Sequence, residues 1–192
     1  MKNRKILIVL LAMLQPAETA APAETKTDAP AEPAQTEETG AYVIGFNNYN
    51  MGSDFPQQLY AGLEAAAAEA GVEIMYAEAA GDPQKMVSNI DAFITAGVDL
   101  IVDFNFNPEV GVTLVQMCDE AQIPLISIDC YYEGAYFFGV NNLLAGKTAG
   151  AFAAELVADK WDNSFDELVL EFNDAAGPEV KQRLEGIVEA LQ

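Results

Sequence analysis

The sequence predicts an α/β fold, a doubly wound parallel sheet with helices on both faces. Three short segments carry this prediction, because each ends an amphipathic stretch and begins an apolar one: Ala70–Ile74, Ala96–Leu100 and Ala121–Leu125. They recur at intervals of 26 and 25 residues. In the first two, Gly71 and Gly97 stand where a helix needs a left-handed residue to end. This spacing is typical of βαβ units, whose parallel sheets bind ligands beyond the carboxyl ends of their strands.

Apolar runs mark the strands, and apolar residues at helical spacing mark the helices between them. The expected strands are Tyr42–Phe46, Glu73–Ala77, Leu100–Phe104, Leu125–Ile128, Tyr136–Val140 and Leu168–Phe172. Asp54 with Pro56, and Asp82 with Pro83, predict the starts of the first two helices, which end at Gly71 and Gly97. The remaining helices are expected over Pro108–Ala121, Leu144–Trp161 and Glu179–Leu191, with a loop at 174–177 before the last.

Residues 1–14 have the form of a secretion signal. Three basic residues lead into a nine-residue apolar core, Ile6–Leu14, which is too short to span a membrane. A short N-terminal strand is the alternative, but it would leave the basic residues unexplained. Residues 15–40 consist largely of Ala, Pro, Thr and Glu, which predicts a disordered tether or an inert tail. We therefore expect an exported protein whose mature domain does not insert into the membrane.

Composition excludes several classes of function. The formal net charge of −21 argues against binding to nucleic acid or to an anionic membrane surface, because both need clustered Lys and Arg. The chain has no histidine, which excludes His-based acid–base chemistry and His-ligated metals. We expect no cofactor and no metal. Cys118 and Cys130 predict two buried thiols, and a disulfide is the alternative if their Cα atoms lie within about 7 Å.

Polar side chains follow the expected strands, so they should meet at one edge of the sheet. They are Asn47, Asn48, Asn105, Asn107, Asp129, Asn141 and Asn142. Aromatic residues lie among them: Phe46, Tyr49, Phe55, Tyr131 and Tyr132. Amides that donate and accept, a carboxylate that accepts, and flat apolar rings together suit a neutral, hydroxyl-rich ligand such as a sugar. Each element has another interpretation: an Asn after a strand often only forms a turn, an aromatic there is often core, and Asp129 could cap a local turn.

Motifs along the folded part resemble those of the periplasmic sugar-binding proteins, the ribose/galactose type of solute-binding protein that serves ABC importers. The resemblance runs from about Tyr42 to the end of the chain. The motifs are Ile44-Gly45, Gly62, Asp82, Ile90 with Ile94, Ala96–Ile101, Ile123–Leu125, Ile128-Asp129 and Gly139–Asn142.

This resemblance implies two α/β lobes with sugar bound in the cleft between them. Residues 41–141 would be the N-terminal lobe and residues 142–192 the incomplete start of the C-terminal lobe. The repeat should continue past the last residue, so we expect a truncated product. The implied cleft contacts are Asn47 and Phe55 on the first-lobe wall, Asn105 facing the cleft, Asp129 accepting from sugar hydroxyls, Asn141 near the crossover and Arg183 donating from the second lobe.

Two departures weaken the implied site. Cys130 stands where many sugar binders carry Arg, and Asn141 stands where the family usually has Asp. We also expect the partial second lobe to weaken binding, because closure of two lobes excludes water from the cleft.

The expected function is that of an extracytoplasmic binding protein, in the periplasm or on the outer face of the cell membrane, that hands a monosaccharide or polyol to an importer permease and breaks no bond. One alternative is the sugar-responsive effector domain of a transcription regulator, but the N-terminus holds no basic helix-turn-helix. The other is a small α/β phosphoryl-transfer enzyme. Asp129 has no second carboxylate two residues on, and Gly45–Asn48 is not a glycine-rich phosphate loop.

Overall fold

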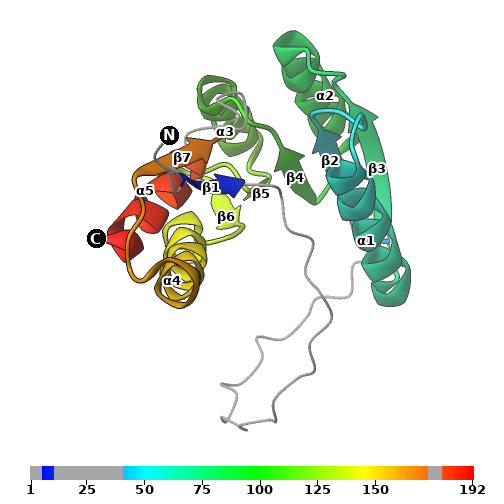
Figure 1. Ribbon diagram of the computed structural model, residues 1–192. Coiled ribbons are helices and arrows are strands. Elements are labelled where there is room, and N and C mark those ends of the chain that lie inside the picture. Colours follow the sequence, from blue (N-terminus) through cyan, green and yellow to red (C-terminus); the bar gives the residue numbers. More distant parts are fainter. Residues whose placement is uncertain (1–5, 11–40, 173–178) are drawn as a thin grey trace, which may run out of the picture.

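The computed structural model describes residues 6–10, 41–172 and 179–192, and its main part is a five-stranded sheet (Figure 1). The strands lie in the order β3-β2-β4-β5-β6, and every neighbouring pair is parallel. Their bounds are β2 Val43–Asn48, β3 Glu73–Glu78, β4 Leu100–Phe104, β5 Leu125–Ile128 and β6 Tyr136–Phe138. The parallel α/β sheet predicted from the repeat is confirmed.

Helices cover both faces of this sheet, as a doubly wound fold requires. Helix α1 (Asp54–Ala70) lies on one face, and α2 (Pro83–Ala96) and α3 (Pro108–Ala121) lie on the other. Strand β4 supplies both cores, because alternate side chains of a strand point to opposite faces. Ile101 packs beneath α2 and α3, whereas Val102 and Phe104 pack on the α1 side. All three are nearly fully buried, which stabilises the fold by roughly 1.5–3 kcal/mol for each large side chain.

The three copies of the repeat end their helices in the same way. Gly71 and Gly97 have left-handed φ angles of 69° and 73° and close α1 and α2. In the third copy Gln122 takes the same conformation, with φ 59°, and closes α3. A left-handed turn from helix into strand therefore recurs even where the third copy has no glycine.

The start of α2 depends on a side-chain cap, which gives a direct test of the helix prediction. Asp82 Oδ1 accepts hydrogen bonds from the backbone N–H groups of Gln84 and Lys85 at 2.8 and 3.4 Å. We expect Asp82→Ala to lower the free energy of unfolding by about 1 kcal/mol in urea denaturation. Ser53, the N-cap of α1, makes no side-chain cap bond, so Ser53→Ala is the matched control. Equal losses in the two variants would contradict the capping role of Asp82.

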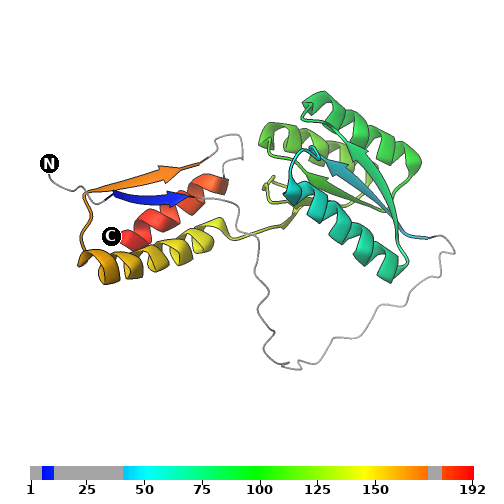
Figure 2. The same ribbon diagram turned by 45° about the vertical axis from the view of Figure 1, so that its right-hand side comes forward.

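A second unit follows the sheet. It contains α4 (Asn142–Trp161), β7 (Glu167–Glu171) and α5 (Glu179–Leu191), with α4 and α5 packed side by side. Figure 2 shows it beside the five-stranded sheet, joined to it by the segment that leads from β6 into α4. Helix α4 begins two residues earlier than predicted because Asn141, rather than a later residue, caps it. Strand β7 lies one residue earlier than expected, and β6 ends before Gly139.

The N-terminal apolar segment differs from its expectation. Ile6–Leu10, predicted as part of a signal core, forms strand β1, which pairs in parallel with β7 over five residue pairs. A run of β-branched and leucine residues suits either role, and the edge of β7 offers it unpaired backbone groups. The pairing does not test export, which stays a prediction. The predicted tether at 15–40 and the loop at 174–177 lie outside the described residues.

Candidate functional site

Asp129 directly follows β5, at the carboxyl edge of the sheet. Its φ angle is 58°, a left-handed conformation that is unusual for a residue other than glycine. Its backbone N–H donates to Phe138 O at 3.0 Å, and its Oδ1 accepts from the Val140 N–H at 3.4 Å. The carboxyl group is partly buried. A strained backbone conformation thus holds one carboxylate between the end of β5 and the segment after β6.

The second unit reaches this edge through α5. Glu179 Oε1 accepts a hydrogen bond from the Tyr131 N–H at 3.0 Å, so the start of α5 contacts the turn that holds Asp129. The other oxygen, Glu179 Oε2, is buried and has no hydrogen-bond partner. One turn further along α5, Arg183 Nε donates to Asn142 Oδ1 at 2.8 Å. The charges of Glu179 and Arg183, both in α5, act on the carboxyl group of Asp129 across the two units.

Burial and nearby charges set the protonation of Asp129. Burial raises the pKa of its carboxyl group above the ordinary value, and the carboxylate of Glu179 raises this pKa further. The Val140 N–H and the positive charge of Arg183 act in the opposite direction. Asp129 therefore has one cationic neighbour, Arg183, and one anionic neighbour, Glu179, which suits a neutral donor-rich ligand better than an anion.

Asn47 lies inside the lobe rather than on an open wall. It is fully buried, and its Nδ2 donates to Asp103 Oδ1 at 2.8 Å and to Met86 O at 3.2 Å. Its Oδ1 accepts from Asn89 Nδ2 at 2.9 Å. Both ends of the amide are therefore paired with β4 and α2, and the contacts of Asn47 with the lobe are structural.

Asn105 and Asn141 make local hydrogen bonds. Asn105, which is 1% exposed, accepts from the Asn107 N–H at 2.9 Å and donates to Asn107 O at 3.1 Å, so it shapes the turn before α3. Asn141 Oδ1 accepts from the Leu144 N–H at 3.0 Å and caps α4. These are the turn and cap roles that an asparagine after a strand commonly takes. Asn141 itself is exposed.

Phe55 belongs to an aromatic cluster at the same end of β2 and β4. Its ring centroid lies 5.6 Å from that of Phe104, which lies 4.8 Å from Phe106, and Phe106 lies 5.6 Å from Tyr49. Phe55 is 37% exposed, so part of its ring remains open to solvent. Exposed aromatic faces pack well against the apolar faces of sugar rings. The sequence indicated Phe55 and Tyr49 but missed Phe106.

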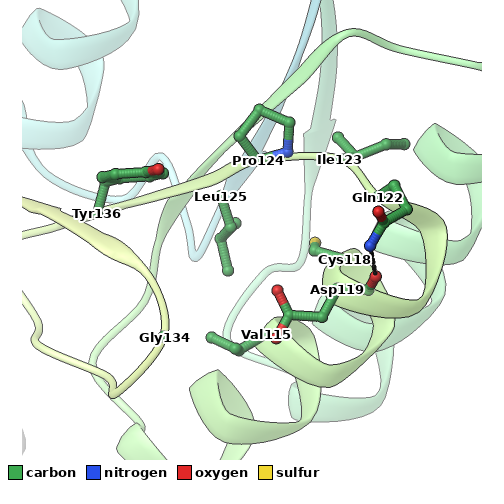
Figure 3. Close-up of a pocket in the computed structure, with 9 residues that line it drawn as sticks. All are labelled: Val115, Cys118, Asp119, Gln122, Ile123, Pro124, Leu125, Gly134 and Tyr136. Atoms are coloured by element: carbon green, nitrogen blue, oxygen red, sulfur yellow. Dashed lines mark hydrogen bonds between the residues drawn. The ribbon is translucent and has the colours of Figure 1, made fainter.

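A pocket of about 290 Å³ lies at the opposite end of β5 (Figure 3). Its walls come from the end of α3, the start of β5 and the approach to β6. The lining residues are Val115, Cys118, Asp119, Gln122, Ile123, Pro124, Leu125, Gly134 and Tyr136. Since Leu125 begins β5 and Asp129 follows its last residue, this pocket is separate from the cluster around Asp129.

Cys118 and Cys130 are buried free thiols, as predicted, and burial raises the pKa of each to about 12. Within residues 6–10, 41–172 and 179–192, no group of three acidic or cysteine side chains could hold a metal ion. None of the described helices is long and apolar enough to cross a membrane.

Similarity to known proteins shows the family to which the chain belongs. The family model described as periplasmic binding protein domain matches residues 44–192. The chain belongs to this family. A curated relative, the ribose import binding protein of Bacillus subtilis, is 25% identical over 132 residues, which are 68% of this chain and 42% of that protein. The family and this relative are binding proteins rather than enzymes, so the phosphoryl-transfer alternative is not supported.

Solved structures of solute-binding proteins share the fold. One from Mycobacterium smegmatis, with bound glycerol, has a TM-score of 0.71 and 26% identity, and the match covers 80% of this chain and 52% of that one. Another, from Clostridium phytofermentans with bound β-D-glucose, has a TM-score of 0.69 and 19% identity, covering 78% and 47% of the two chains. The chain therefore spans about half the length of the relatives that it matches.

Glu179 is another residue that the sequence did not indicate. It begins a helix, where an acidic residue is expected for its effect on the helix dipole. Its contact with Tyr131, its buried Oε2 and its effect on the pKa of Asp129 distinguish it from such a residue. Arg183 was found because of the resemblance, through the Arg-x-x-Gly spacing that ends at Gly186.

Proposed function

We propose that this protein is an exported solute-binding protein that binds a monosaccharide or a similar polyol and delivers it to the permease of an ABC importer. The placement of Asp129 carries the proposal. A partly buried carboxylate, held by a left-handed backbone at the carboxyl edge of the sheet, faces Arg183 and Glu179 from the second unit. Sugar hydroxyls both donate and accept, so they can bond to carboxylates and a guanidinium together.

Groups at the carboxyl edge of the sheet favour a small neutral ligand. Glu179 Oε2 is buried without a partner, and a ligand hydroxyl would relieve the cost of that unpaired oxygen. The open part of the Phe55 ring offers an apolar surface for a sugar face. Glycerol and β-D-glucose are bound by two solute-binding proteins with the same fold, which supports a polyol or sugar as the ligand class.

Calorimetric titration of the 192-residue chain with D-ribose, D-glucose, L-arabinose, glycerol and myo-inositol tests this function. We expect at least one of them to bind, and Asp129→Asn to weaken that binding by about 10- to 100-fold, because a hydrogen bond to a charged group is worth roughly 1.5–3 kcal/mol. Asp91→Asn, on the exposed side of α2, is the control and should bind like the wild type. No heat with any of the five ligands, or unchanged affinity in Asp129→Asn, would refute the proposed site.

A further inference from the structure

Asp103 is a carboxylate in the middle of the buried sheet. It lies in β4 between Val102 and Phe104 and is fully buried. A leucine there would avoid the desolvation of a carboxylate, which costs several kcal/mol unless hydrogen bonds replace the lost water. The structure supplies those bonds from two directions. Asn47 Nδ2 donates to Oδ1 at 2.8 Å, and the Tyr132 hydroxyl donates to Oδ2 at 2.6 Å.

The two bonds join different parts of the lobe. Asn47 lies beside Asp103 in the register of β2 and β4, and it is fastened to α2 through Met86 O and Asn89. Tyr132 belongs to the turn after β5, three residues beyond Asp129. Asp103 therefore connects the rigid centre of the sheet to the turn that carries the candidate site.

Tyr132 is well suited to hold that turn. It is 2% exposed, and its ring lies against α3 at Gly111, where a Cβ atom would collide with the ring. Its carbonyl accepts from the Ala135 N–H at 3.2 Å. The turn contains a strained left-handed Asp129, and such a conformation persists only where the surroundings determine it. The turn is therefore held at two points, by the packing of the ring against α3 and by the hydrogen bond of the hydroxyl to β4.

We propose that Asp103 is a positioning residue for the candidate site, acting through the Tyr132 hydroxyl on the turn that presents Asp129 and Tyr131. This inference rests on the proposed function in one respect only, namely that the turn helps to bind a ligand. Side chains of several elements face Asp103, and the titratable ones are Tyr132 and Cys130 after β5 and Cys118 in α3. Asn47 and Asn105 complete its surroundings with neutral donors.

Hydrogen exchange of the free 192-residue chain tests the positioning without any ligand. Tyr132→Phe keeps the ring and removes only the hydroxyl. We expect peptides covering residues 129–138 to exchange about tenfold faster in this variant, while peptides from α1 exchange as in the wild type. Tyr136→Phe, whose side chain is 71% exposed, is the matched control and should change neither region. Unchanged exchange over residues 129–138 in Tyr132→Phe would overturn the inference.

Titration with the five sugars and polyols named above separates positioning from general stability. We expect Tyr132→Phe to lose about tenfold in affinity, whereas Asp82→Ala, which is also destabilised but lies away from the turn, should bind like the wild type. Equal losses in both variants would mean that stability alone is responsible, and would overturn the inference. If the wild type binds none of the five ligands while the turn still exchanges faster in Tyr132→Phe, the proposed function fails and the positioning role stands.

Discussion

Replacing Gly146 with alanine should destabilise the protein, although alanine is the better helix former. Gly146 lies in α4, and a Cβ atom there would collide with the backbone oxygen of Arg183 in α5. Two more glycines make the same close approach: a Cβ at Gly150 would lie 2.7 Å from Ile187 O, and one at Gly186 would meet the backbone of Leu143. The obstructing atoms are backbone, so relief requires the two helices to separate.

The expected cost follows from two opposing effects. Alanine gains about 1 kcal/mol of helix propensity over glycine, and forced overpacking costs about 1–3 kcal/mol or more where backbone must move. We expect Gly146→Ala to lower the free energy of unfolding of the α4–α5 unit by about 2 kcal/mol, measured by urea denaturation and by hydrogen exchange of α5. Because α5 carries Glu179 and Arg183, sugar affinity should fall as well.

Gly62 provides the matched control. It is also a helical glycine, in α1, but a Cβ atom there would meet nothing within 4 Å. Gly62→Ala should therefore stabilise the protein by about 0.5–1 kcal/mol. The two substitutions are chemically identical and are expected to have opposite signs. If Gly146→Ala stabilised the protein as Gly62→Ala does, the close packing of α4 and α5 would be wrong.

Periodicity predicted the fold well because the relevant physics is local. Apolar runs, helix caps and left-handed helix ends lie within a few residues of one another, so they can be found in the sequence. Strand order was not predicted, because β4 pairs with β2 rather than with β3, the strand that precedes it in the sequence. The structure of Ile6–Leu10 was harder to predict, because an apolar run of that length suits a signal core or a strand. Its partner strand β7 also lies more than 150 residues away.

The site was less predictable, because its chemistry depends on pairing between distant segments. Asn47 has the sequence position of a ligand contact, yet its register partner across β2 and β4 is Asp103, and two buried polar side chains on one face bond to each other. Asp103 itself was available as a clue, since it is a lone carboxylate within the apolar run Leu100–Phe104. Glu179 could not be recognised without knowing that α5 begins against the turn at Tyr131.

The second large effect that we expect is a pH dependence of the stability, caused by Asp103. Burial raises the pKa of its carboxyl group to about 7, and hydrogen bonds from Tyr132, Asn47 and Asn105 limit the rise. The ordinary pKa of an aspartate in an unfolded chain is 3.8. Between these two values the folded protein keeps a proton on Asp103 that the unfolded chain releases. The contribution of Asp103 is therefore fully present below about pH 3.8 and is lost as the pH rises through about 7.

Comparison with Asp103→Asn isolates this contribution, because the other titrating groups are shared by both proteins. We expect the free energy of unfolding of the wild type, minus that of Asp103→Asn, to fall by a few kcal/mol between pH 4 and pH 7.5, since each unit of pKa shift is worth about 1.4 kcal/mol. Urea denaturation at four pH values across this range measures the difference. A difference that stays constant or rises with pH would contradict the raised pKa.

Tyr132→Phe should shift the pH dependence of the stability in a known direction. The Tyr132 hydroxyl donates to the charged form of Asp103 and so lowers its pKa, which means that removing the hydroxyl raises the pKa further. The fall in stability, referred to the double variant with Asp103→Asn, should then be centred at a higher pH than in the wild type. A shift to lower pH would mean that the hydroxyl does not stabilise the charged carboxylate, and that the contact between the sheet and the turn does not depend on the ionisation of Asp103.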